Sequence, residues 1–207
     1  MTDIQQPDDR HSNDPKAVLH RYLTRSRDAV LWKLDGLSEH DVRRPLTPTG
    51  TNLLGIIKHL AGVEAGYFGD CLGRPVPDMP AWYSEMMADT LEDNGDMWAR
   101  EDETREEILD LYARVTAHAD AVIEELALED TGTVEWWGDA GTAVTLQWFL
   151  VHMIAETNRH GGHVDIVREL IDGAAGMRPD ASNLPSNDVA YWETHQQRVQ
   201  AAADHFA

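Results

Sequence analysis

The chain alternates between long stretches of helical periodicity and shorter polar connections. Apolar side chains recur three and four positions apart in four segments, and we expect helices over about residues 15–35, 52–73, 108–126 and 145–171. The third segment is the clearest, because its apolar stripe runs unbroken from Ile108 to Leu126. Strand-like alternation is absent apart from one short extended piece, which we expect at Thr133–Trp136. The pattern is that of an all-α protein.

The connections suggest how these helices are arranged. Residues 75–102 contain Pro75, Pro77 and Pro80 and are too long for a tight hairpin, so they fit a crossover between helices. A further helix is expected at about Asp188–Asp204, after a loop that contains Pro179 and Pro185. The sequence therefore predicts a four-helix bundle with a long crossover and a C-terminal helical appendage.

The chain divides into three parts on this interpretation. Residues 1–13 are polar and acidic without periodicity, and we expect a disordered tail. Residues 14–177 would form the bundle, and residues 178–207 a C-terminal loop and helix. The apolar face of that last helix is too sparse for a core of its own. We therefore expect the helix to dock on the bundle or on a second subunit, and a homodimer is one of the assemblies considered.

Composition narrows the classes of function. The 17 Lys and Arg residues face 37 Asp and Glu residues, giving a formal net charge of −20. Nucleic acids and anionic membrane surfaces would repel such a chain. It has no apolar run of membrane-spanning length, no signal-peptide pattern, and a single cysteine, Cys71, which excludes an internal disulfide framework. These features predict a soluble, cytoplasmic protein.

Polar groups gather on the inward face of the fourth helix. At 100° per residue, Glu156, His160 and His163 lie about 40°, 80° and 20° from His152, so all four share one sector. Phe149 falls within the same sector, which marks this face as the one that turns toward the core. An unpaired polar group in a core costs roughly 1–3 kcal/mol, so these groups need partners.

The second helix supplies a further candidate. His59 lies beside the apolar stripe, and several glycines share that side of the helix, which indicates a close approach or a cavity next to it. The glycines are Gly55, Gly62, Gly66 and Gly69. One carboxylate and two imidazoles from facing helices would form a three-ligand metal site with an open position, as in catalytic zinc centres. The same i, i+4 spacing of Glu156 and His160 also fits a surface ion pair, and His152 and His163 also fit core-lining roles.

The same residues carry a family resemblance. Residues 53–64 (LLGIIKHLAGVE) and 152–169 (HMIAETNRHGGHVDIVRE) resemble the DinB-like superfamily, and the similarity extends over roughly residues 15–175. It is strongest to the branch called domain of unknown function 664, which is common in actinobacteria. The resemblance implies a four-helix bundle that holds a divalent metal through His59, Glu156 and His160. This His-Glu-His set departs from the three-histidine form and agrees with that of mycothiol-dependent maleylpyruvate isomerase, a related member.

The resemblance also implies a function. Members with known functions use small thiols such as mycothiol, so it implies a metal-dependent S-transferase that adds a small thiol to a small electrophile. Two imidazoles and one carboxylate leave a Zn²⁺ site at net +1, and a metal-bound thiolate would bring it to zero. Zinc is the metal expected first, and nickel, iron or manganese also suit these ligands. The alternatives are a hydrolase or isomerase that uses a metal-bound water, and a bundle that binds metal or thiol without turnover.

Three further residues are assigned roles around this site. We expect His163 to line the pocket or to orient a metal ligand, because it lies in the sector of Glu156 and His160. Arg159 and Arg168 are candidates for holding an anionic substrate, although helical arginines in so acidic a chain often pair with a nearby carboxylate.

Overall fold

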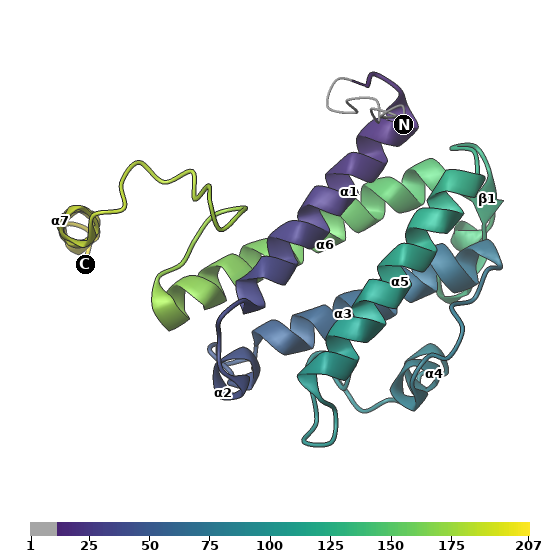
Figure 1. Cartoon of the computed structure of the whole chain (residues 1–207), viewed down its shortest axis with the longest axis horizontal. Helices are drawn as coiled ribbons and strands as arrows, with labels where there is room; N and C mark the ends of the chain where they lie inside the picture. The colour runs from purple at the N-terminus through teal and green to yellow at the C-terminus, as the bar shows by residue number, and fades with distance from the viewer. Residues whose placement is uncertain (1–11) are drawn as a thin grey trace, which may run out of the picture.

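The computed structural model describes residues 12–207 and has an all-α architecture with four long helices (Figure 1). Helix α1 packs along α6, α3 packs along α5, and α3 also contacts α6. These helices span Pro15–Leu31 (α1), Leu53–Glu64 (α3), Arg105–Glu125 (α5) and Leu146–Asp172 (α6). The predicted four-helix bundle is therefore confirmed. Most of the expected tail, residues 1–11, lies outside the described part of the chain.

Local signals explain where the long helices begin and end. Asp14 caps α1 by accepting a hydrogen bond from the Ala17 amide, and Thr104 and Glu107 form a reciprocal capping box at the start of α5. Helix α3 continues without a break through a π-helical turn, η3 (Ala65–Gly69), and a 3₁₀ turn, η4 (Asp70–Leu72). It stops at Gly73, whose φ of +68° is a left-handed conformation that glycine adopts readily.

Short elements fill the connections between the long helices. They are η2 (Trp32–Leu34), α2 (Glu39–Arg43), α4 (Ala81–Met87), β1 (Thr131–Gly132), η5 (Glu135–Gly141) and β2 (Val144–Thr145). Strands β1 and β2 pair antiparallel, with Thr131 opposite Thr145. The extended piece expected at Thr133–Trp136 is wrong in position, because the chain turns there and the Val134 amide bonds back to the Gly141 carbonyl.

The core fills the space between the four helices. The apolar side chains on the inward faces of α3, α5 and α6 are mostly buried, as the periodicity predicts. Phe149 is among the completely buried residues, which confirms that its face of α6 turns inward.

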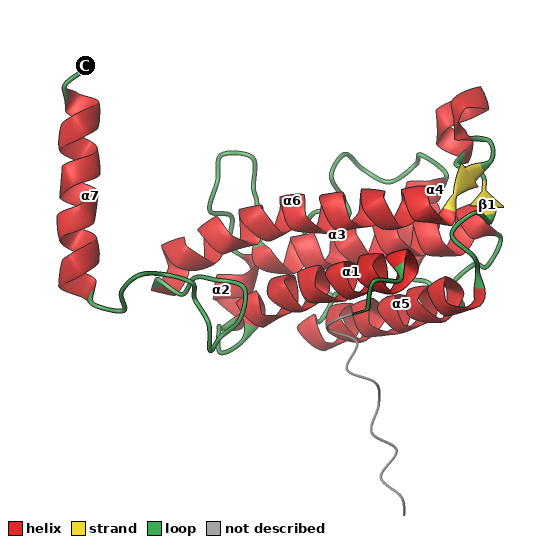
Figure 2. Ribbon diagram, turned by 90° about the horizontal axis from the view of Figure 1, so that it is seen from above, coloured by secondary structure: helices red, strands yellow, loops and turns green. Residues whose placement is uncertain are grey.

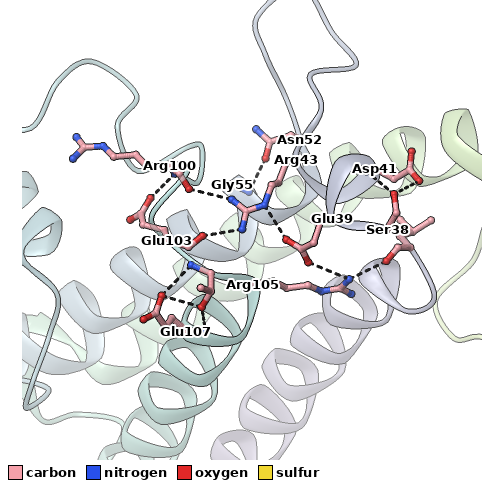
Figure 3. Close-up of polar contacts among 12 residues, drawn as sticks. Ser38, Glu39, Asp41, Arg43, Asn52, Gly55, Arg100, Glu103, Arg105 and Glu107 are labelled. Carbon is pink, nitrogen blue, oxygen red and sulfur yellow. Dashed lines mark hydrogen bonds and ion pairs between the residues drawn. The ribbon is translucent and has the colours of Figure 1, made fainter.

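Hydrogen bonds hold the C-terminal end of the crossover between α3 and α5 against the bundle. Arg43 on α2 donates hydrogen bonds to the carbonyls of Arg100 and Glu103, and it pairs with Glu39 one turn away on α2 (Figure 3). The Arg100 amide in turn donates to the Glu103 carboxylate at 2.7 Å. These bonds hold residues 100–103 against the bundle, so the crossover enters α5 from a defined position.

The C-terminal helix α7 (Val189–Asp204) stands apart from the bundle (Figure 2). None of its residues is buried, and the exposed apolar side chains include Val189, Val199 and, beyond the helix, Phe206. Of the two arrangements expected for this helix, docking on its own bundle is not seen, because its apolar face remains open, and docking on a second subunit stays a prediction. Within residues 12–207, no helix is both long and apolar enough to cross a membrane.

Candidate metal centre

Three side chains converge where α3 and α6 face each other. The Nε2 atoms of His59 and His160 lie 3.4 Å and 3.0 Å from the same oxygen of Glu156. One donor atom from each residue lies within 4.8 Å of the other two, and the two imidazole rings are 4.7 Å apart between centroids. The two segments singled out in the sequence thus meet in space and place two nitrogens and one carboxylate oxygen around one point.

The helical frame accounts for this convergence. Glu156 and His160 are one turn apart on α6, so their side chains lie above one another on the same face. His59 comes from the facing helix α3, and the contact between α3 and α6 sets its distance. His160 is 7% exposed, and its Nδ1 atom is buried without a hydrogen-bond partner. His160 is therefore enclosed by the bundle, and it retains a donor or acceptor that the protein does not satisfy.

The charges of the three groups are strongly coupled. Burial lowers the pKa of His59, but hydrogen bonds to Asp96 and Glu156 outweigh it and raise that pKa to about 9. The hydrogen bond from His59 and the nearby charge of His160 lower the pKa of Glu156 to about 2. Burial, together with the charge on His59, lowers the pKa of His160. These shifts favour a positive charge on His59, a negative charge on Glu156 and a neutral His160.

Asp96 is a fourth member of this site, and sequence analysis missed it. Its carboxylate accepts a 2.6 Å hydrogen bond from Nδ1 of His59, and this bond lowers the pKa of Asp96. A carboxylate on the far nitrogen of a histidine fixes the tautomer and the orientation of the ring, and this leaves Nε2 for a ligand. Asp96 lies in the irregular crossover, where no periodicity or spacing marks it, so no local signal could have found it.

Side chains of α3 and its N-cap residue bind the crossover and so place Asp96 next to His59. The buried ammonium of Lys58 donates to the carbonyls of Gly95 and Trp98 and pairs with Glu103. Asn52 donates to the carbonyl of Met97 at 3.1 Å. That carbonyl also lies over Gly55, where an added Cβ would be 1.8 Å from it, so only glycine permits this approach. One of the glycines noted in the sequence thus serves to bring Asp96 close.

A cleft of about 620 Å³ opens beside Glu156. Gly62 and Gly66 of the α3–η3 helix contribute to its wall, and an added Cβ on Gly66 would be 3.8 Å from the ring of Trp136. Tyr67 and Trp136 form an edge-to-face pair there, with ring centroids 5.5 Å apart. The glycine-rich side of α3 therefore provides both a close approach and a cavity.

The other candidate residues lie around this group or away from it. His152 lines the cleft and stacks on Trp148 with centroids 4.6 Å apart, and burial lowers its pKa. His163 is exposed, and its ring contacts that of His160 at 5.3 Å between centroids.

One of the two candidate arginines, Arg168, lies away from the candidate metal centre. Arg168 lies twelve positions beyond Glu156, about 18 Å along the helix. It pairs with Asp172 and donates to the carbonyls of Lys33 and Asp35. Arg159 is exposed. The structure therefore offers no support for an anion-holding role of Arg168, because its guanidinium is already engaged in joining α6 to the end of α1 and η2.

The donor set fits a divalent transition metal. Two imidazole nitrogens and one carboxylate oxygen are ligands that zinc, nickel, iron and manganese accept, and three protein ligands leave a coordination position free. The orientation of His59 by Asp96 and the adjoining cleft match the surroundings of a catalytic metal rather than a closed structural one.

Comparison with known proteins agrees with these observations. The family model described as mycothiol-S-transferase matches residues 18–173, which include all four long helices except the first three residues of α1. No curated protein matches the chain. The matched region contains His59, Asp96, Glu156 and His160, and it ends before α7.

Proposed function

Because the chain belongs to the mycothiol-S-transferase family, we propose that it transfers a small thiol of the mycothiol type to a small electrophile in a metal-dependent reaction. His59, Glu156 and His160 would be the metal ligands, and zinc would be the metal. The observation that carries the proposal is the convergence of these three donors next to an open cleft, within the region that the family model matches.

A divalent metal at this position would lower the pKa of a coordinating thiol, which is ordinarily about 8.5, and so supply thiolate at neutral pH. The protein's own cysteine does not suit this role. Burial raises the pKa of Cys71 to about 12, which keeps it a thiol. The reacting sulfur would therefore belong to the co-substrate, as the family name indicates.

The surrounding side chains would position and deprotonate the co-substrate. Asp96 holds the His59 ring through Nδ1, so the Nε2 atom of that ring remains directed at Glu156 and His160. His152 lines the cleft and has a lowered pKa, so its ring is neutral at pH 7 and can accept a proton from an entering thiol. The aromatic wall formed by Tyr67 and Trp136 would keep bulk water away from the reacting groups.

The proposal can be tested with zinc-loaded protein, mycothiol and monochlorobimane. Sulfur would displace chloride from the bimane, the thiol proton would pass to the buffer, and the fluorescent thioether would accumulate faster than without protein. His59→Ala, Glu156→Ala and His160→Ala should each lower both the bound metal, measured by elemental analysis, and this rate. His195→Ala is the matched control, since His195 lies on α7, away from the bundle.

Other outcomes would redirect the assignment. Full metal occupancy in any of the three ligand variants removes that residue from the proposed ligand set. Consumption of an electrophile at the same rate with and without thiol would favour a hydrolase. Metal binding without turnover for any thiol would reduce the protein to a binding bundle.

A further inference from the structure

The walls of the cleft beside Glu156 are mostly apolar. Val63, Tyr67, Met86, Met87 and Trp136 line it, and the glycines of α3 form a flat part of its wall. Tyr67 and Trp136 present aromatic surfaces at a steep angle to each other, and the two methionines add flexible apolar surface. Walls of this kind favour a flat, apolar molecule.

The charges of the cleft have one sign. Asp89 and Glu156 line it, and none of the described residues that line it is a Lys or an Arg. His152 also lines the cleft, and its imidazole carries no fixed positive charge. Glu156 and a thiolate co-substrate together supply two negative charges, which balance a divalent cation. No positive charge then remains to pair with a negatively charged second substrate, and Asp89 would repel it.

We infer that the second substrate is an uncharged, flat, aromatic electrophile, and that carboxylate-bearing electrophiles are rejected. This inference rests on the proposed function and assigns the substrate class of the same site. The reaction would form a bond between the thiol sulfur and the electrophilic carbon. For an aryl halide, the carbon–halogen bond would break, halide would leave with its electron pair, and the thiol proton would pass to the buffer.

Two aryl chlorides that differ by one charge test the inference. Methyl 4-chloro-3,5-dinitrobenzoate is neutral, and 4-chloro-3,5-dinitrobenzoate is its anionic counterpart. For each, kcat/KM with mycothiol and zinc-loaded protein is divided by the uncatalysed rate constant with the same thiol, which removes the difference in intrinsic reactivity. We expect the ratio to favour the ester by roughly tenfold or more, the size of one unfavourable charge contact. Equal ratios, or a preference for the acid, would overturn the inference.

A charge introduced at the cleft should reverse this preference. Met87 is 39% exposed at the end of α4 and lines the cleft, so Met87→Lys can fold normally and places an ammonium beside the entering substrate. We expect the relative rate for the anionic chloride to rise by roughly tenfold. Met177→Lys is the matched control, because Met177 is exposed after α6 and outside the cleft. A similar change in both variants would show a general effect of net charge and contradict the assignment to this cleft.

Binding of unreactive analogues separates this inference from the proposed function. Methyl 3,5-dinitrobenzoate and 3,5-dinitrobenzoate lack a leaving group, and calorimetry can measure their affinities for the zinc-loaded protein in the presence of mycothiol. Tighter binding of the ester, weakened by Trp136→Ala and restored by Trp136→Phe, supports the inference even where no thiol transfer is observed. Equal binding of the acid refutes it even where transfer is observed. Trp136 is 51% exposed, so its removal leaves the core intact.

Discussion

Helix α3 contributes to two polar clusters of the bundle that lie close to each other. One is the candidate metal centre around His59. The other, the Arg27 cluster, consists of Arg27 on α1, Glu64 on α3, and Tyr112 and Asp120 on α5. His59 and Glu64 are five residues apart, or about 7.5 Å along the helix axis. The clusters therefore use similar residue types in similar surroundings, yet they differ in how their polar atoms are satisfied.

The charged atoms of the Arg27 cluster are satisfied by hydrogen bonds within the cluster. Arg27 donates to both oxygens of Glu64, at 3.0 Å and 2.6 Å, and to Asp120 at 2.6 Å. Burial raises the pKa of Glu64, and this paired guanidinium opposes the shift. In the metal centre, by contrast, the candidate metal-binding atoms of His59, Glu156 and His160 point toward one another. One buried nitrogen of His160 has no hydrogen-bond partner, and a cleft opens beside Glu156. Burial of charge alone does not distinguish a functional site, whereas unsatisfied and convergent donors do.

The largest expected effect comes from breaking the Arg27 cluster. Arg27→Met would leave the Glu64 carboxylate buried without a counter-charge, so the free energy of unfolding should fall by about 3–5 kcal/mol in urea denaturation. The double variant Arg27→Met/Glu64→Met removes both charges and should recover most of this loss. Metal affinity of the folded double variant should match that of the wild type. A single variant as stable as the wild type would show that the Arg27 cluster is not structural.

Glu156→Gln should have its larger effect on metal affinity and its smaller effect on stability. Loss of a residue that only orients a metal ligand lowers metal affinity roughly 10–100-fold. Glu156→Gln removes a charged ligand itself, so its metal affinity should fall by more than this. The unfolding free energy of the metal-free protein should fall by less than in Arg27→Met, since both histidines can become neutral when their carboxylate partner is removed. Calorimetric zinc titration and urea denaturation of the same samples separate the two quantities. A large loss of stability with unchanged zinc affinity would make this cluster a structural one as well.

Asp96→Asn should have a smaller effect on the metal centre. The amide can still contact His59 but does not fix the Nδ1–H tautomer, so zinc affinity should fall roughly 10–100-fold. Asp93→Asn is the matched control, because Asp93 is an exposed acid on the same crossover. Should both variants bind zinc equally well, Asp96 would have no orienting role.

Asp96 also marks the limit of what the sequence predicts. The four long helices follow from apolar periodicity and capping residues, and Glu156 and His160 follow from their one-turn spacing, all of which are local properties. The contact between His59 and Asp96 depends instead on the path of the crossover, set by Lys58 and by the carbonyl packed on Gly55. The glycine was a visible signal, but the group that approaches it is remote in sequence.

The difference between local signals and contacts between remote residues also explains where the observed fold departs from the predicted one. The extended piece at Thr133–Trp136 had suitable residues, but contacts with Gly141 turn the chain there. Helix α7 was predicted at nearly its observed position, because capping and periodicity are local. Its docking on the bundle is not seen, because a sparse apolar face does not specify a partner.

The acid dependence of stability should also report on the Arg27 cluster. Burial raises the pKa of Asp120, but its bonds to His20 and Arg27 outweigh this and lower the pKa overall. A carboxyl with a lowered folded-state pKa stabilises the protein above its unfolded value of about 3.9 and loses this contribution as pH falls through the folded value. The unfolding free energy should therefore fall less steeply below pH 4 in Asp120→Asn than in the wild type. Asp110→Asn, an exposed acid on the same helix, should keep the wild-type slope.

The smallest effect is expected from removing residues 178–207. Both clusters draw their residues from the bundle, and α7 contributes no buried side chain to it. The bond from Lys33 on η2 to the carbonyl of Gly176 survives this truncation, so the segment after α6 keeps its contact with the bundle. Zinc affinity and urea stability should therefore match the full chain within experimental error. Loss of zinc binding in a truncated protein that remains helical would place part of the metal centre in the C-terminal segment. A change in molar mass by light scattering, with zinc affinity unchanged, would instead show that α7 covers a second copy of the chain, as its open apolar face allows.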